Sequence, residues 1–183
     1  TANNCLGAFH ATEHLIFEGY KRIVHITSSA HLSITKERLR GYKAALQKHN
    51  IPFVESLVKY CNHGGMISEE VEVAVKELFS AKQKPDAFFT ASDRITTLCL
   101  RVLKETRQKK SDVGVIGFTN SNFGDLFYPP LSVVRQPAFE IGQVATEMLI
   151  QIIESKRPIT EFETKVLDTE LIVRESSLKK TTA

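Results

Sequence analysis

The sequence lacks any long hydrophobic run and any recognisable leader. No apolar stretch among its 183 residues approaches the roughly 20 that a helix needs to span a bilayer. Residues 1–4 (TANN) have neither the basic start nor the apolar middle of a signal peptide. We therefore expect a soluble chain with no membrane partner. Because it also lacks an initiator methionine, we expect it to be a piece of a longer protein.

Cysteine is scarce and shows no pairing pattern. The chain has three cysteines, Cys5, Cys61 and Cys99, which lie far apart in apolar surroundings and form no C-x-x-C motif. An odd, scattered set of this kind fits reduced thiols better than a disulfide framework. The cysteines therefore favour a cytoplasmic location.

Neither sign of charge dominates. There are 24 lysines and arginines against 21 aspartates and glutamates, a formal net charge of +3, which is too small for the electrostatic footprint of a nucleic-acid-binding domain. A content of 42% hydrophobic and 25% charged residues is ordinary for one globular domain with a sizeable core. This composition excludes intrinsic disorder, collagen and a coiled-coil rod.

Common catalytic and phosphate-binding motifs are absent. The chain has no G-x-S-x-G elbow, no phosphate-binding P-loop and no G-x-G-x-x-G after a strand. Gly114 and Gly117 fall inside a predicted strand, where close packing explains them better than a dinucleotide does. His25 lies inside another predicted strand and is interpreted as a core or edge residue. We expect no catalytic residue and no cofactor.

One metal-like pattern is present. His10, Glu13 and His14 match H-x-x-E-H, and the i and i+4 spacing places both histidines on one face of a helix. A catalytic zinc ion needs a third protein ligand, and this helix offers no obvious one. We therefore predict no metal site and interpret both histidines as helix-surface residues. The alternative is a zinc enzyme, and stoichiometric zinc bound to the pure protein would support it.

Strand-like and helix-like segments alternate along most of the chain. β-branched runs predict strands, and apolar positions at helical spacing predict helices. Helices are predicted over 4–18, 33–49, 69–82, 93–107 and 138–155, and strands over 22–27, 57–60, 86–90, 113–118, 131–135 and 165–174. Residues 119–130 are predicted to be a loop containing at most one turn of helix, and 175–183 a frayed tail. This rhythm predicts an α/β fold with a mainly parallel sheet and helices on both faces.

Polar side chains follow four of the predicted strands. In an open parallel sheet, ligands bind beyond the carboxyl ends of the strands, a rule that selects residues 27–29, 61–63, 92–94 and 119–120. Asp93 and Arg38 are the charged candidates, and the small polar groups around them suit a hydroxyl-bearing ligand. The simpler alternative for Ser92 and Asp93 is a helix cap without any ligand.

A series of short segments carries a further signal: GAFHATEHL (7–15), GYKRI (19–23), RLRGY (38–42), PDA (85–87) with SD (92–93), VIGF (115–118), PLSVVRQP (130–137) and ELIVRESS (170–177). In this order and spacing they resemble the effector domain of the lactose and galactose repressor (LacI/GalR) family. The resemblance covers almost the whole chain. It implies one lobe of a two-lobed, type I periplasmic-binding-protein-like fold with the effector between the lobes.

The resemblance also implies how the chain is divided. Residues 3–134 with 165–175 would form the C-terminal lobe, and 138–163 would belong to an N-terminal lobe that is mostly absent, as is the helix-turn-helix. Residues 176–183 would be a tail. The helix over 138–155 then has an apolar stripe that must be covered by something else or be exposed, namely Ile141, Ala145, Met148, Leu149 and Ile152.

Individual site residues follow from the same resemblance. It assigns effector binding to five residues and the dimer interface to two: Arg38, Ser92, Asp93, Thr119 and Gln136, and Thr97 and Phe127. One position departs from the family pattern, because Thr119 stands where an aspartate commonly follows Gly-Phe. A hydroxyl lacks the charge and the bidentate grip of a carboxylate, so a standard sugar effector is less firmly indicated.

The resulting hypothesis is a cytoplasmic transcriptional regulator. Its homodimer would sense a small polar effector, a carbohydrate or a phosphorylated or acidic derivative, and would bind operator DNA through the helix-turn-helix that this chain lacks. An extracytoplasmic sugar-binding protein of the same fold is the alternative binding class. An enzyme is the third class, supported only by the H-x-x-E-H match.

Overall fold

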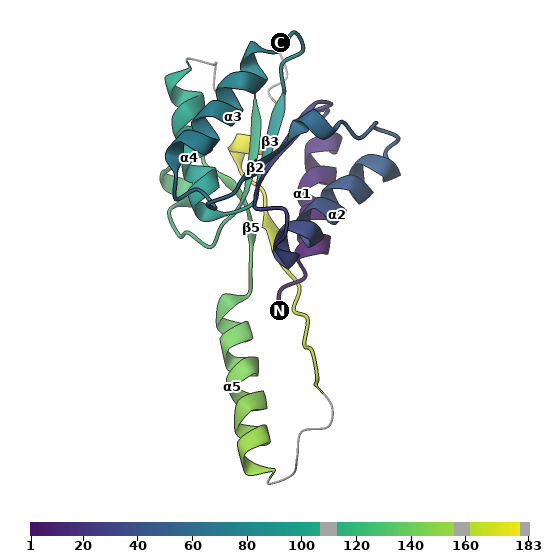
Figure 1. Ribbon diagram of the computed structural model, residues 1–183, viewed down its shortest axis with the longest axis vertical. Helices are drawn as coiled ribbons and strands as arrows, with labels where there is room; N and C mark the ends of the chain where they lie inside the picture. The colour runs from purple at the N-terminus through teal and green to yellow at the C-terminus, as the bar shows by residue number, and fades with distance from the viewer. Residues whose placement is uncertain (107–112, 156–161, 180–183) are drawn as a thin grey trace.

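The computed structural model describes residues 1–106, 113–155 and 162–179 of the chain. A compact lobe built on one sheet makes up most of it, and a single long helix extends away from that lobe (Figure 1). No helix in these ranges is both long enough and apolar enough to cross a membrane.

One six-stranded sheet forms the centre of the lobe, with the strand order β2-β1-β3-β4-β5-β6. The first five strands in this order are parallel, and β6 pairs antiparallel with β5. The predicted α/β class with a mainly parallel sheet is confirmed. The strands are β1 (Ile23–Ser28), β2 (Val58–Cys61), β3 (Ala87–Thr90), β4 (Gly114–Phe118), β5 (Ser132–Arg135) and β6 (Glu170–Ile172).

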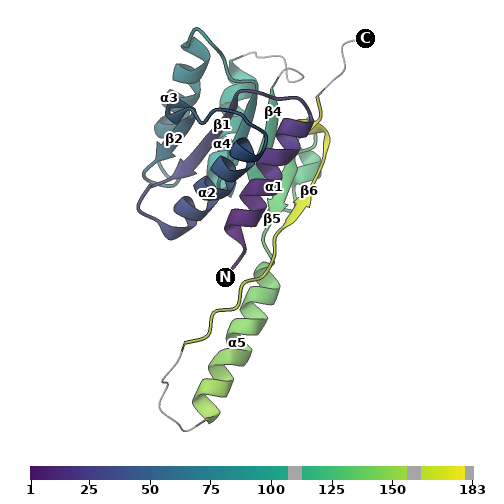
Figure 2. The ribbon, with the colours of Figure 1, turned by 90° about the vertical axis from the view of Figure 1, so that its right-hand side faces the viewer.

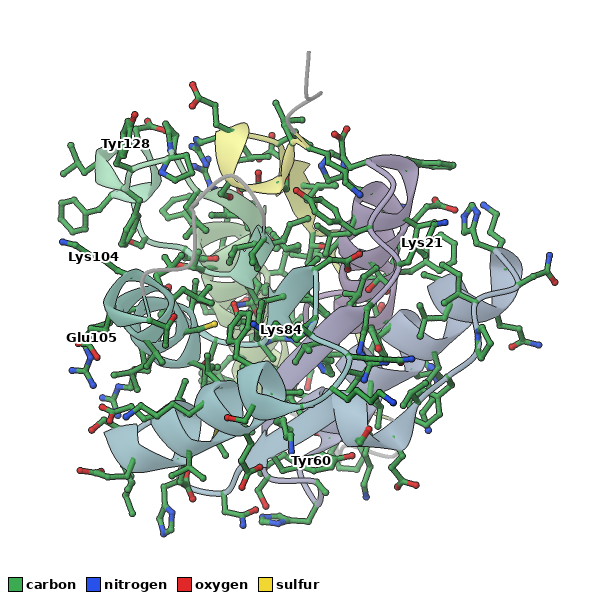
Figure 3. The ribbon with its side chains drawn as sticks, turned by 90° about the horizontal axis from the view of Figure 1, so that it is seen from above. Lys21, Tyr60, Lys84, Lys104, Glu105 and Tyr128 are labelled. Atoms are coloured by element: carbon green, nitrogen blue, oxygen red, sulfur yellow. The ribbon has the colours of Figure 1, made fainter. Side chains whose placement is uncertain are left out.

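Two helix pairs enclose this sheet. Helices α1 (Asn4–Phe17) and α2 (Ser33–Lys48) cover one face, and α3 (Ser68–Ser80) and α4 (Asp93–Glu105) cover the other (Figures 1 and 3). Side chains alternate along each strand, so the sheet packs two separate cores. Ile23 of β1 packs with Tyr42 on the α1–α2 side, whereas Val24 and Ile26 pack with the α3–α4 side.

Short 3₁₀ turns interrupt three of the loops. They are η1 (Glu55–Leu57), η2 (Gly124–Leu126) and η3 (Glu175–Ser177). The predicted loop over 119–130 therefore contains one helical turn, η2. Most predicted elements differ from the observed ones by one or two residues at one or both ends, and residue 107 of the fourth predicted helix lies outside the described residues.

The last predicted strand is much shorter than expected. Only three residues of 165–174 form β6, because the segment before them pairs with the N-terminus instead of the sheet. The Asn3 N–H donates to the Leu167 carbonyl at 2.7 Å, and the Leu167 N–H donates to the Thr1 carbonyl at 2.9 Å. We call residues 162–169 the strap.

The expectation of a frayed tail is wrong at its first residues. Ser176 and Ser177 are buried, and the Ser176 hydroxyl accepts the Ser132 N–H at 2.8 Å and donates to the Val115 carbonyl at 2.7 Å. The small side chains that suggested a tail fit closely against β4 and β5. Residues 180–183 of the predicted tail lie outside the described residues.

Helix α5 (Ala138–Glu154) has no buried residue. It projects from the lobe with the strap running back beside it (Figures 1 and 2). Ile141, Val144 and Met148 line a small pocket shared with the strap, whereas Leu149 and Ile152 of the predicted stripe are exposed. The sequence predicts an apolar stripe on this helix that is either covered or exposed, and much of the stripe is exposed.

Candidate functional site

The carboxyl ends of β1, β3 and β4 bring the predicted polar residues to one edge of the lobe. Arg38 reaches this edge from the inner face of α2, where its side chain is only 4% exposed. Its guanidinium group lies 3.8 Å from the centre of the Phe118 ring. Burial lowers the pKa of Arg38 to about 10, so the group is a buried cation at neutral pH.

Arg38 uses its donors on groups from three separate parts of the chain. Its Nε and Nη2 atoms donate to Asn4 Oδ1 at 2.9 and 2.8 Å, and Nη2 also donates to Gln136 Oε1 at 3.1 Å. Nη1 donates to the Ala91 carbonyl, directly after β3. The planar fork of an arginine suits several fixed acceptors of this kind. The structure therefore brings together Arg38 and Gln136 among the predicted effector residues.

Asp93 and Thr119 form a second pair at the same edge. The buried Thr119 hydroxyl donates to Asp93 Oδ1, and the Ser121 N–H donates to Thr119 Oγ1 at 3.0 Å. Asp93 itself is exposed at the start of α4. The threonine that replaces the expected aspartate thus holds a carboxylate supplied by the neighbouring strand–helix junction. A carboxylate with a fixed orientation accepts hydrogen bonds from ligand hydroxyls.

Ser92 caps helix α4. Its side-chain oxygen accepts the Ile95 N–H at 3.3 Å, and its carbonyl accepts the Thr96 hydroxyl at 2.7 Å. This is the simpler role that the sequence left open for Ser92. A contact between Ser92 and an effector stays a prediction.

Two asparagines complete the arrangement. Asn4, which the sequence reasoning missed, joins the first residue of α1 to Arg38. Asn120, which belongs to the predicted ligand position at residues 119–120, bonds both backbone groups of Gln136. The only sequence signal for Asn4 was its position after Asn3, whose side chain caps α1 by accepting the Leu6 N–H at 3.2 Å.

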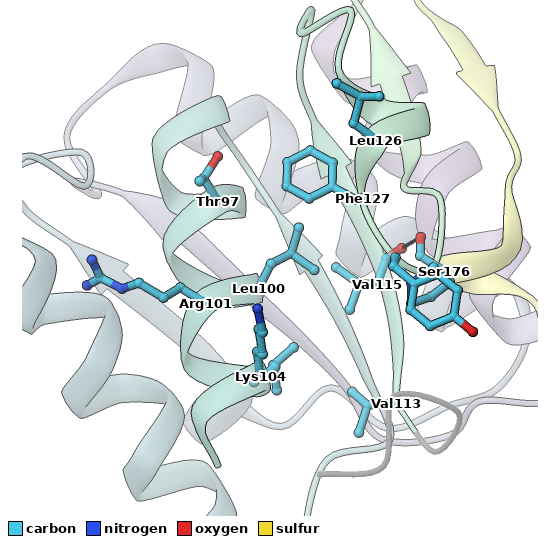
Figure 4. A pocket seen from close by; sticks show the side chains of 12 residues that line it. Thr97, Leu100, Arg101, Lys104, Val113, Val115, Leu126, Phe127 and Ser176 are labelled. Atoms are coloured by element: carbon cyan, nitrogen blue, oxygen red, sulfur yellow. Dashed lines mark hydrogen bonds between the residues drawn. The ribbon is translucent and has the colours of Figure 1, made fainter. Parts of the chain in front are cut away.

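Two neighbouring pockets share Thr97 and Phe127 in their linings, and the first is lined by several of the groups described above. One of about 370 Å³ is lined by Asp93, Thr96, Thr97, Thr119, Asn120, Ser121, Phe127 and Leu131. The other, of about 470 Å³, lies between α4 and the 126–129 loop, and Thr97 and Phe127 face each other across its upper part (Figure 4). The two residues predicted for a dimer interface therefore line the same apolar hollow.

The H-x-x-E-H pattern does not assemble a metal site in the described part of the chain. The Glu13 carboxylate accepts hydrogen bonds from Lys48 and His49, each at 2.8 Å, and these bonds lower its pKa. His14 Nε2 lies 2.9 Å from Ser177 Oγ. Within the ranges that the structure describes, no three His, Cys, Asp or Glu side chains are grouped to hold a metal ion.

His25 occupies the core below the site. Its ring is stacked between Tyr42 and Phe89, and Nδ1 donates to the Phe89 carbonyl at 3.2 Å. Nε2 is buried without a hydrogen-bond partner among the described residues. Burial lowers the pKa of His25 to about 3, so the ring is neutral.

Comparison with known proteins places this geometry in a family. Residues 12–177 match the periplasmic binding protein-like domain. The chain belongs to this domain family. It is 34% identical to the HTH-type transcriptional regulator CelR of Thermobifida fusca over 95% of this chain and 50% of that protein. The ribose operon repressor of Haemophilus influenzae is 31% identical over 95% of this chain and 51% of its own length.

Solved structures agree with this placement. A complex of the regulator CelR with cellobiose superposes with a TM-score of 0.85 at 32% identity, covering 96% of this chain and 52% of that one. The resemblance to LacI/GalR-family effector domains is confirmed by these relatives. The chain spans about half the length of the curated relatives that it matches.

Proposed function

We propose that this chain is the effector-binding and dimerisation part of a LacI-type transcriptional regulator. The observation that carries the proposal is the match of residues 12–177 to the binding-protein domain, with transcriptional regulators as relatives on both sequence and structure. These relatives favour a regulator over an extracytoplasmic solute-binding protein and over an enzyme. The three cysteines are free thiols, which suits the cytoplasm where such regulators work.

The proposed effector is a small polar molecule, a carbohydrate or a derivative of one. Arg38 supplies a fork of donors, Asp93 supplies a carboxylate that Thr119 orients, and Ser92 and Gln136 stand beside them. Acceptors and donors in such proximity match the mixed hydrogen bonding of sugar hydroxyls. The relatives include a regulator solved with cellobiose and a repressor of a ribose operon.

The proposed mechanism is closure of two lobes. Residues 3–134 with 165–175 would form one lobe, and residues 138–163, which include α5, would belong to a second lobe supplied by the rest of the protein. The lack of any buried residue on α5 supports this division. Effector binding would shift the population toward the closed form and change the spacing of the DNA-binding heads in a dimer. Operator DNA and effector would then alter each other's affinity by the same factor.

A homodimer is proposed through the apolar pocket between α4 and the 126–129 loop. Leu126 and Tyr128 are 79% and 81% exposed at its rim, and Tyr128 lies at the outer margin of the lobe (Figure 3). A two-fold interface is self-complementary, so a protruding loop beside a hollow suits pairing with a second copy. Thr97 and Phe127 would lie inside such an interface.

A thermal-shift experiment on the full-length protein tests the effector proposal. We expect cellobiose, ribose or one of their phosphates to raise the melting temperature, because a ligand at 100 times its dissociation constant adds about 2.7 kcal/mol of stability. Arg38→Lys keeps the charge but loses the planar fork, so it should lose the shift. Arg40→Lys, on an exposed position of the same helix, is the matched control and should keep it. A shift that survives Arg38→Lys would remove Arg38 from the effector site.

A further inference from the structure

The chain leaves the sheet through Gln136 and Pro137, which connect β5 to α5. The side chain of Asn120 holds this connection by both of its polar atoms. Asn120 Oδ1 accepts the Gln136 N–H at 2.8 Å, and Asn120 Nδ2 donates to the Gln136 carbonyl at 2.9 Å. The ladder between β4 and β5 has its last backbone bond at Thr119 N–H to the Val134 carbonyl, 3.2 Å. The Asn120 amide thus continues the ladder by one further pair, made by a side chain.

The side chain of the same glutamine is held from a different element. Gln136 Oε1 accepts from Arg38 Nη2, and the other donors of Arg38 reach Asn4 and the Ala91 carbonyl. Asn4 directly follows residues 1–3, which pair with the strap. Arg38 therefore contacts both the β5–α5 connection and the start of α1. Asn120 in turn fixes the position of the backbone in the β5–α5 connection.

The direction of α5 depends on this short connection. Helix α5 buries none of its residues in the lobe and projects away from it (Figure 2). Its cap residue, Pro137, offers no side-chain hydrogen bond, and the Ala138 N–H bonds the Gln136 carbonyl at 2.8 Å, the same oxygen that Asn120 holds. Fixing Gln136 thus fixes the residue from which α5 starts, because Asn120 bonds the same carbonyl that accepts the Ala138 N–H. The first helical bond, from the Ile141 N–H to the Pro137 carbonyl at 2.9 Å, follows one residue later.

We propose that Asn120 is a positioning residue for the β5–α5 connection, and that it couples occupancy of Arg38 to the direction of α5. With its backbone fixed by Asn120, Gln136 keeps its side chain in reach of Arg38. An effector that takes the Nη2 donor of Arg38 removes the side-chain restraint on Gln136, so the connection can turn about its two bonds to Asn120 and α5 turns with it. The coupling to α5 rests on the proposed lobe closure, whereas the positioning of the connection by Asn120 does not need an effector.

Hydrogen exchange on the full-length protein tests the positioning directly. Wild type, Asn120→Ala, Asn120→Asp and the matched control Asn122→Ala, an exposed asparagine of the same loop, are compared over residues 132–140. Loss of the two bonds should speed exchange there about tenfold in Asn120→Ala, with peptides of β1 and β3 unchanged. Asn120→Asp should restore only part of the protection, since a carboxylate still accepts the Gln136 N–H but cannot donate to the Gln136 carbonyl.

A second measurement uses cellobiose and ribose as probes of closure. In Asn120→Ala, the affinity for a sugar that binds the wild type should change less than about threefold, whereas most of the sugar-induced change in radius of gyration should be lost. If neither sugar affects the wild type, the proposed carbohydrate effector is contradicted, and the positioning role of Asn120 is then tested by the hydrogen-exchange data alone. Unchanged exchange over 132–140, or exchange that rises equally in β1 and β3, would overturn the proposal. A large loss of sugar affinity with closure intact would also overturn it, since Asn120 would then be an effector contact.

Discussion

At the scale of single residues, burial decides which polar groups can act. Arg38 keeps its charge because four fixed acceptor contacts replace water around it. His25 has the opposite outcome, since only one of its ring nitrogens has a partner among the described residues. A carbonyl can only accept, so the bond to Phe89 fixes the proton on Nδ1 and leaves Nε2 as a bare acceptor. Protonation there would place an uncompensated charge in the core.

The stability of the protein should therefore depend on pH through His25. Its pKa is about 3 when folded and about 6.5 when unfolded, so the unfolded chain binds the proton more readily between these values. Stability is full above pH 6.5 and is lost as the pH falls, by about 1 kcal/mol per pH unit below pH 6. Urea unfolding of the full-length protein from pH 7 to pH 5 measures this slope. His25→Phe should make the slope shallower and leave the part due to His14, whose pKa is also lowered by burial, whereas the exposed His10→Gln should leave the slope unchanged. Equal slopes in wild type and His25→Phe would contradict the assignment.

At the scale of elements, the chain after β6 closes the lobe. Ser176 and Ser177 bond β4 and β5 at a point more than 40 residues away in sequence. Ser177 Oγ also lies 2.6 Å from Ser132 Oγ and 2.9 Å from His14 Nε2, so it joins α1 to the sheet. Hydroxyls of this kind satisfy buried backbone groups that no strand partner reaches.

Removing the Ser176 hydroxyl tests this closure. Ser176→Ala leaves the Ser132 N–H and the Val115 carbonyl without their side-chain partner, and each unmade buried bond costs about 1–3 kcal/mol. We expect the free energy of unfolding, measured in urea, to fall by at least about 1 kcal/mol. Ser80→Ala, an exposed serine at the end of α3, is the control and should change it little. An unchanged urea midpoint in Ser176→Ala would show that residues 175–177 do not stabilise the lobe.

The elements themselves were largely predictable, and the exceptions have one cause. Alternating strands and helices are encoded by local periodicity, which is why the limits of β4 and α5 are close to the predicted ones. The strap and the 175–177 segment are held by bonds to residues 1–3 and to β4 and β5, and short-range patterns do not record such pairings. The same limit applies at the candidate site. Arg38 and Gln136 are both predicted as site residues, but the bond between them spans 98 residues, and the partner Asn4, 34 residues from Arg38, has no such prediction.

At the scale of the whole molecule, this chain presents two exposed apolar surfaces. One is the apolar side of α5, where Leu149 and Ile152 are exposed. The other is the hollow between α4 and the 126–129 loop, with Leu126 and Tyr128 at its rim. Exposed apolar surface next to a concave apolar surface is typical of association sites. We expect a second lobe to cover the first surface and a second copy of the chain to cover the second.

The assembly should then be sensitive to a charge at the second surface. Leu126→Asp places a carboxylate where a two-fold interface would bury it, and we expect the dimer dissociation constant of the full-length protein to rise about 100-fold or more. Phe17→Asp is the control, because Phe17 is also an exposed apolar residue but lies on α1, outside the pocket lining. Analytical ultracentrifugation over a concentration series measures both constants. If Phe17→Asp dissociates the dimer and Leu126→Asp does not, the copies associate through the α1 side, and neither Thr97 nor Phe127 belongs to the interface.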